Sequence, residues 1–258
     1  MDMQSAVVLL SGGQASTTCL AWATKKFESL HTVSFFYGQR HRCELEFAVE
    51  LSKKAEALSH KVIDLSDLFA QVTKSRLMEK DSAIADKSQD DPVLPASFVP
   101  FRNVFFLTVA AAHAYFLKAG NLVTGICQTD YSGYPDCRNE FAKAINLVLT
   151  LAVAKPLEVH TPLMWMTKAD TVKLMMVMES ADLQCWDWLA RTHTCYEGQF
   201  PPCGQCSACV LRANGFREAG YGDPLVQRAI YEMKLLPDCD RFSGRYPAGN
   251  EEQAEMGV

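Results

Sequence analysis

Four cysteines in the C-terminal third of the chain have a spacing that suits metal binding. Cys203, Cys206 and Cys209 follow one another with two residues between them, and Cys195 lies just upstream. Four thiolates in such a knuckle are typical of a structural, tetrahedral zinc site, which leaves no open position for water. A ferredoxin-type iron–sulfur motif would instead have a further cysteine, followed by proline, just downstream, where Val210 begins a different segment. The pattern favours one structural zinc ion per chain.

A second candidate site lies near the N-terminus, where a short apolar run ends in a pair of glycines and a cluster of hydroxyls. Glycines let the backbone approach an anion closely, and the N–H groups at the start of a helix point at it. The chain has no Walker-type G-x-x-x-x-G-K-[ST] motif, and a glycine pair alone also suits an ordinary tight turn. We refer to residues 10–17 as the phosphate loop. Its candidate phosphate-binding residues are Leu10, Ser11, Gly12, Gly13, Gln14, Ser16 and Thr17.

Length and composition limit the classes of protein that remain. The chain has 258 residues, of which 48% are hydrophobic and 21% charged, as in a globular protein with one large domain and a small appendage. Its net charge of -5 argues against a general nucleic-acid binder. No apolar stretch reaches the roughly 18 residues of a membrane span. Ten cysteines without a secretion signal indicate a reducing cytoplasm.

Alternating strand and helix patterns predict how these sites are positioned. Strands are expected at 6–10, 32–36, 61–65 and 122–126, and helices at 42–58, 104–117, 140–154 and 167–178. This alternation predicts an α/β fold, with a Rossmann-like parallel sheet covered by helices on both faces. Ligands bind at the carboxyl ends of such strands, where Ser11, Tyr37 and Gln128 would fall.

Three regions are expected along the chain. Residues 1–185 would form the nucleotide-binding domain, residues 186–242 a small helical region around the cysteines, and residues 243–258 a frayed polar tail. The charged segment 76–99 lacks a clean period and is a candidate lid over the site.

Several further motifs, taken together and in this order, resemble one enzyme family. They are Ser11–Gln14, Tyr37–Arg42, Phe98–Pro100, Arg102–Asn103, Thr124–Gly125, Ser132–Arg138, Thr161–Trp165 and the cysteine knuckle with Leu211–Gly215. The chain is similar to the QueC family of 7-cyano-7-deazaguanine synthases, in the PP-loop ATP pyrophosphatase superfamily. The resemblance runs from about Ala6 to about Tyr231 and implies the HUP/PP-loop form of the parallel sheet.

What the resemblance implies is an adenylating enzyme. Such proteins use ATP to convert the carboxylate of 7-carboxy-7-deazaguanine into an acyl adenylate. Ammonia then displaces AMP to give an amide, and a second ATP activates this amide for dehydration to the nitrile. Magnesium is the expected counterion of the phosphates. The resemblance also implies a homodimer.

The resemblance assigns candidate roles outside the phosphate loop as well. Arg40, His41, Arg102 and Lys168 would counter phosphate charge, and Ser11, Arg102 and Lys168 are the catalytic candidates. For all four basic residues the alternative is a solvated surface position. The deazaguanine and its carboxylate would be contacted by Tyr131, Tyr134, Asp136 and Arg138.

Three positions depart from the family pattern at the nucleotide end of the site. Ala15 and Phe36 stand where the family has aspartate, and Phe101 stands where it has glycine. The aspartate of the loop would help to hold magnesium, so Ala15 should weaken metal-assisted activation. Changes in three separate segments favour a natural reshaping of the pocket; an engineered inactivating mutation at Ala15 is the alternative.

Three functions are therefore open. The first is an ATP-dependent ligase that couples the deazaguanine acid to an amine such as a protein N-terminus, as described for QueC-like proteins of type IV CBASS antiphage operons. A secondary amide of this kind cannot be dehydrated to a nitrile. The second is the synthase of queuosine biosynthesis, which uses ammonia. The third is a catalytically impaired subunit that binds a nucleotide or a deazaguanine.

Overall fold

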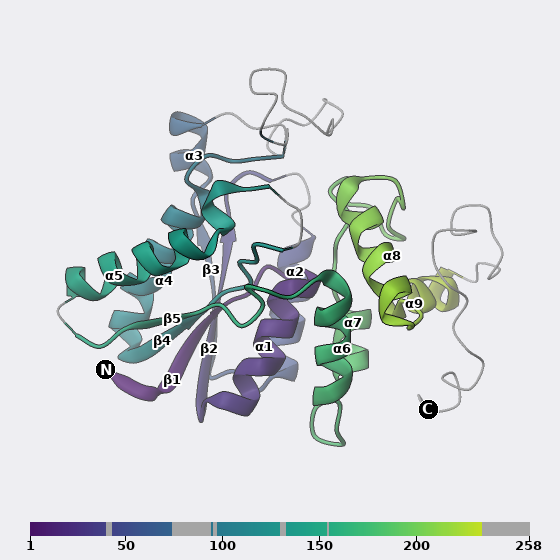
Figure 1. The fold of residues 1–258 in the computed structure, drawn as a ribbon, viewed down its shortest axis with the longest axis horizontal. Coiled ribbons are helices and arrows are strands. Elements are labelled where there is room, and N and C mark those ends of the chain that lie inside the picture. The colour runs from purple at the N-terminus through teal and green to yellow at the C-terminus, as the bar shows by residue number, and fades with distance from the viewer. Residues whose placement is uncertain (40–42, 74–93, 95–96, 130–132, 154, 234–258) are drawn as a thin grey trace.

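The computed structural model shows a parallel β-sheet flanked by helices and followed by a helical C-terminal region (Figure 1). The structure describes residues 1–39, 43–73, 94, 97–129, 133–153 and 155–233. The expected tail at 243–258 and nearly all of the expected lid at 76–99 lie outside these residues.

The sheet has five parallel strands in the order β3-β2-β1-β4-β5. Their bounds are β1 Asp2–Leu9, β2 Ser29–Phe36, β3 Ser59–Asp64, β4 Ala119–Val123 and β5 Glu158–His160. The parallel sheet expected from the sequence is confirmed. The fifth strand was not predicted, because its three residues are too few to show a pattern.

Helices cover both faces of the sheet, and each face has its own core (Figure 1). The helices between the strands are α1 Gln14–Lys26, α2 Glu44–Lys54, α3 Ser66–Val72, α4 Arg102–Leu117 and α5 Asn139–Val153. On one face Leu20 of α1 and Leu51 of α2 pack against β1. On the other face Leu107 of α4 and Ile145 of α5 pack against Leu122 of β4. The alternation of strands and helices thus buries one apolar core on each face of the sheet.

The C-terminal region packs onto α1 and shares its core. It begins after β5 with α6 Lys168–Met178 and continues with α7 Cys185–Ala190, α8 Ser207–Ala219 and α9 Pro224–Met233. Thr167 starts α6 with a capping box, since its hydroxyl accepts the Asp170 N–H at 3.1 Å and the Asp170 carboxylate accepts the Thr167 N–H at 3.0 Å. Gly215 lets α8 approach α6, because a Cβ there would lie 2.6 Å from the Cβ of Lys168.

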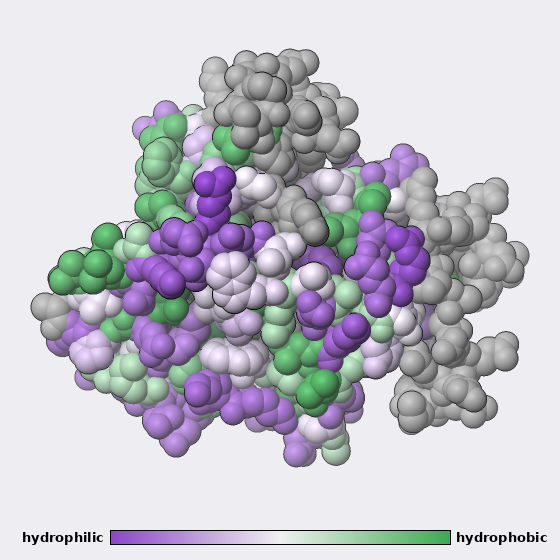
Figure 2. Space-filling view, viewed as in Figure 1, coloured by the Kyte–Doolittle hydropathy of each residue, from purple (hydrophilic) through white to green (hydrophobic). Residues whose placement is uncertain are grey.

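The surface mixes polar and apolar residues, with an apolar group near the end of α5 (Figure 2). Leu147 and Leu151 of α5 are 59% and 72% exposed, and Phe116 of α4 is 78% exposed. Among the described residues, no helix combines the length and the apolar character that crossing a bilayer requires.

Candidate functional site

A cavity of about 340 Å³ opens at the carboxyl ends of β1, β2 and β4. The phosphate loop, the start of α4 and the C-terminal region all contribute to its walls. The residues predicted from the sequence that line it are Leu10, Ser11, Gly13, Gln14, Ser16, Arg102, Tyr134 and Lys168. Ala15, at a position that departs from the family pattern, lines it too. Three other predicted residues, Arg40, His41 and Tyr131, lie outside the described residues.

The phosphate loop is held by hydrogen bonds among its own residues. The Ser11 and Ser16 hydroxyls lie 3.0 Å apart, and the Gly13 N–H donates to Ser11 Oγ at 3.3 Å. Ser16 Oγ donates to the Gly13 carbonyl at 3.0 Å. Helix α1 begins at Gln14 without a side-chain cap, so its first N–H groups are available to an anion in the cavity. This arrangement suits an anion, and phosphate binding by the loop stays a prediction.

Gly12 shows why the loop needs glycine. Its φ of 84° is in the left-handed region, which residues with a Cβ avoid. A Cβ at this position would lie 2.3 Å from the carbonyl oxygen of Glu44, at the start of α2. The Gly12 carbonyl accepts the backbone N–H of His193 at 2.9 Å. Gly12 is therefore packed closely between the start of α2 and the segment around His193.

Gln14 and Thr17, like Ser11 and Ser16, use their side chains in hydrogen bonds within the protein. Gln14 Nε2 donates to Thr171 Oγ1 of α6 at 3.1 Å, and Gln14 is buried. Thr17 Oγ1 donates to the Gly13 carbonyl at 2.9 Å, and Thr17 is fully buried and does not line the cavity. Their contact with a phosphate remains a prediction, and the loop backbone with Ser11 and Ser16 is better placed for it.

Arg102 supplies positive charge to the cavity from the first residue of α4. Its guanidinium lies over the rings of Tyr37 and Tyr134, 5.9 and 5.5 Å from their centroids. Burial disfavours the charge, but the surrounding groups, Tyr37 first among them, raise the pKa of Arg102 above its ordinary value. Arg102 thus places a permanent cation, packed against aromatic rings, in the cavity that the phosphate loop also lines. The solvated surface position considered for Arg102 is not what the structure shows.

Sequence reasoning missed several residues that line the same cavity, among them the titratable residues Glu44, His193 and Tyr196. Burial raises the pKa of Glu44 to about 8, and the nearby Arg102 opposes this shift. Burial also lowers the pKa of His193, whose ring stacks on Phe47 at 5.8 Å. Glu44 lies two residues after the Tyr37–Arg42 motif, and this proximity was the available signal.

A smaller cavity of about 100 Å³ adjoins the first and shares Tyr134 with it. Arg138 lines this smaller cavity, and its predicted role in substrate binding stays a prediction. Asp136 lines neither cavity: its carboxylate accepts the backbone N–H of Asn103 at 3.0 Å, and Asn103 Nδ2 donates to its carbonyl at 3.0 Å. Asp136 therefore fixes residues 133–138 to α4, and its predicted contact with the substrate stays a prediction.

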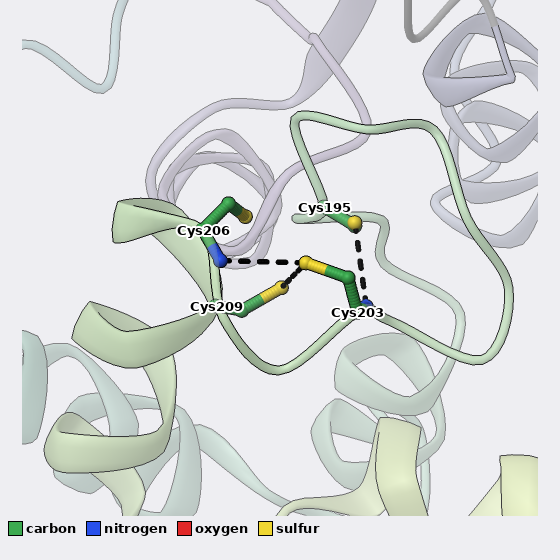
Figure 3. A group of neighbouring side chains, drawn as sticks. All are labelled: Cys195, Cys203, Cys206 and Cys209. Atoms are coloured by element: carbon green, nitrogen blue, oxygen red, sulfur yellow. Dashed lines mark hydrogen bonds between the residues drawn. The ribbon is translucent and has the colours of Figure 1, made fainter. Parts of the chain in front are cut away.

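The four cysteines predicted from their spacing converge on one point (Figure 3). The sulfur atoms of Cys195, Cys203, Cys206 and Cys209 all lie within 4.8 Å of one another, and those of Cys203 and Cys209 are 3.9 Å apart. A tetrahedral ion with metal–sulfur bonds of about 2.3 Å needs sulfur atoms about 3.8 Å apart. The donor set fits one tetrahedral metal ion.

Comparisons with known proteins support the resemblance noted in the sequence. The sequence model of a family described as queuosine biosynthesis protein QueC matches residues 5–220. The 7-cyano-7-deazaguanine synthase of Chromobacterium violaceum is 47% identical over 235 residues, which cover 90% of this chain and 97% of that protein. The enzyme of the same name from Laribacter hongkongensis is 44% identical over 227 residues, or 88% and 96% of the two chains.

Among solved structures, a 4-thiouridine synthetase in complex with RNA and bound ATP aligns with 91% of this chain and 50% of its own. Its TM-score is 0.43 and its sequence identity is 14%, so this likeness carries no argument about function.

Proposed function

Because the chain belongs to the QueC family, we propose that it uses ATP to activate the carboxylate of 7-carboxy-7-deazaguanine. The observation that carries this proposal is the shared cavity, to which both the phosphate loop and Tyr134 of the Ser132–Arg138 stretch contribute. A carboxylate resists attack by an amine because oxide is a poor leaving group. Adenylation replaces that leaving group with AMP.

In the proposed reaction a carboxylate oxygen attacks the α-phosphorus of ATP and pyrophosphate leaves. The loop backbone with Ser11 and Ser16 would bind phosphate oxygens, while Arg102 and Lys168 would balance their charge. Tyr134 and Arg138 would hold the deazaguanine acid in line with the phosphorus. An amine then attacks the acyl carbon and AMP departs with one of the original carboxylate oxygens.

Magnesium and zinc would have different tasks. Magnesium binds phosphate oxygens with one or two carboxylates, and Glu44 is the only carboxylate among the described residues that line the large cavity. Zinc would be held by Cys195, Cys203, Cys206 and Cys209, and the four protein ligands would leave it no position for catalysis. Zinc in this role braces the fold.

Ammonia is the first candidate for the amine. Both curated relatives are named 7-cyano-7-deazaguanine synthase, and this chain covers nearly their whole length. With ammonia the first product is a primary amide, which a second ATP can activate for dehydration to the nitrile.

A protein amine is the second candidate, and Ala15 is the observation that favours it. Ala15 lines the cavity at a position where the family pattern has a metal-binding aspartate. A site with weakened metal binding suits one activation better than two, and a secondary amide requires only one. Such conjugation would place the protein in antiphage defence, whereas a chain that has lost both activations would be the catalytically impaired binding subunit.

Mass spectrometry of the reaction products tests these alternatives. The protein is incubated with ATP, magnesium and the deazaguanine acid, with and without ammonium. Nitrile formed with ammonium supports the synthase, and AMP without nitrile, together with a mass increase on a co-expressed partner, supports the conjugating ligase. No AMP under any condition contradicts the proposal.

A matched pair of variants ties the activity to the cavity. Arg102→Gln should abolish most AMP formation, because it removes the cation beside the phosphate loop. Arg191→Gln should leave AMP formation unchanged, since Arg191 pairs with Glu50 and Asp187 outside the cavity. Homodimer formation remains a prediction of the family resemblance, which light scattering can check.

A further inference from the structure

Arg212 of α8 is one of the largest fully buried side chains among the described residues, with 2% of its surface exposed. Its guanidinium forms two hydrogen bonds with the Asp223 carboxylate, at 2.6 and 2.8 Å. Desolvating two charges is costly, and well-packed apolar residues often stabilise a core as well as a buried ion pair does. Packing alone therefore does not account for this pair. The other hydrogen bonds of Arg212 indicate that it also positions a neighbouring segment.

The remaining donors of Arg212 hold the segment that supports the phosphate loop. Arg212 Nη1 donates to Thr192 Oγ1 at 2.7 Å and to Thr194 Oγ1 at 3.1 Å. These two threonines flank His193, whose backbone N–H donates to the Gly12 carbonyl at 2.9 Å. One side chain thus fixes both neighbours of the residue that anchors the phosphate loop.

Three of the four cysteines lie close to His193 or at the start of the helix that carries Arg212. Cys195 directly follows Thr194, Cys206 is the N-cap of α8, and Cys209 lies in the first turn of the helix that carries Arg212. A metal ion at the cysteines would cross-link the segment around His193 to the helix of Arg212. A continuous set of contacts then joins the cysteine site to Gly12 through Arg212.

We propose that Arg212 is a positioning residue that couples metal binding at the four cysteines to nucleotide binding at the phosphate loop. Without metal, residues 192–195 gain freedom and the Gly12 carbonyl loses a fixed partner. A nucleotide must then order this segment as it binds, and this cost weakens its affinity. The inference rests on the proposed function in one respect, namely that the nucleotide is ATP.

The coupling can be measured in the wild-type protein because it must be reciprocal. Saturating ATP with magnesium should tighten zinc binding about tenfold in a chelator competition, and zinc should tighten ATP binding by the same factor in calorimetry. Equal zinc affinities with and without bound ATP would overturn the proposal.

Variants then locate the coupling in Arg212. The double change Thr192→Val and Thr194→Val removes both hydroxyl partners of Arg212 Nη1 and keeps the Arg212–Asp223 pair, so the protein should fold and bind zinc. In this variant ATP should no longer affect zinc affinity. Arg212→Lys, which keeps the charge but loses the planar fork, should also weaken the coupling. Arg191→Lys is the matched control and should leave it intact.

The experiment separates two kinds of failure. If ATP does not bind at all, the proposed function fails with the coupling. If ATP binds without changing the zinc affinity, only the coupling is wrong. The same holds for the role of Arg212 if ATP still changes the zinc affinity of the folded double variant to the full extent. A thermal melt of each variant confirms that it is folded before its affinities are compared.

Discussion

The two walls of the large cavity are held together by different means. The wall on the sheet side is the phosphate loop, where Ser11, Gly13 and Ser16 bond to one another within six residues of sequence. The wall on the C-terminal side is the segment 189–223, where Arg212 reaches Leu189 and Asp223 through side-chain contacts. The first wall is held by short-range bonds between serine hydroxyls and the backbone, whereas the second is held by a buried ion pair and by the segments that carry the four cysteines.

Loss of the metal should therefore affect the second wall far more than the first. Cys206→Ser should destabilise the protein by several kcal/mol, because structural zinc contributes about 10 kcal/mol or more to small zinc-binding folds. Hydrogen exchange should show that α8 loses protection while β1 and β4 keep theirs. Cys43→Ser is the control: Cys43 lies outside the cluster, and a serine hydroxyl can replace its contacts with His193 and Gly198, so the change should have little effect. Equal loss of protection in both walls would contradict the comparison.

The sheet-side wall should instead fail at Gly12. Gly12→Ala forces a Cβ to 2.3 Å from the Glu44 carbonyl at a φ of 84°, and should cost roughly 2–4 kcal/mol in urea denaturation together with most ATP affinity. Gly13→Ala is the matched control for stability, because its nearest neighbours lie at 3.4 and 3.5 Å and its φ is negative. It should cost no more than about 0.5 kcal/mol. An equal loss of unfolding free energy in the two variants would show that the close contact of Gly12 with α2 does not hold the loop.

A metal-dependent change in ATP affinity is the next expected effect. Ala15→Asp should tighten ATP binding about tenfold with magnesium, because it adds a carboxylate ligand beside the phosphates. Without magnesium the same change should weaken ATP binding, since the new charge faces the phosphates directly. Calorimetry in the two buffers checks both signs. Unchanged affinity with magnesium would remove the argument for a reshaped metal site.

The smallest predicted effect concerns the start of α4. Phe101 has a φ of 59° and is 68% exposed, so its side chain gains little packing for the strain of a left-handed backbone. Phe101→Gly should stabilise the fold by roughly 1 kcal/mol. Lys118→Gly, at a φ of 62° at the other end of α4, should act in the same direction. Destabilisation by Phe101→Gly alone would mean that the ring has a contact which outweighs the strain.

The same contrast explains what could be predicted from the sequence. The phosphate loop and the cysteine knuckle are local patterns, so their residues were identified before the fold was known. Asp136 was assigned to the substrate, but its carboxylate has a partner 33 residues away in Asn103, which no local pattern indicates. Arg212 was recognised only as part of a motif, because its partners come from the tertiary fold.

The central claim is that the acid attacks the α-phosphorus of ATP in this cavity, and isotope transfer tests it most directly. The protein is incubated with ATP, magnesium, ammonium and the deazaguanine acid carrying ¹⁸O in both carboxylate oxygens, and the AMP is analysed by mass spectrometry. Adenylation predicts one ¹⁸O in each AMP from the first activation. AMP without the label, alongside amide or nitrile formed from the acid, would contradict the account.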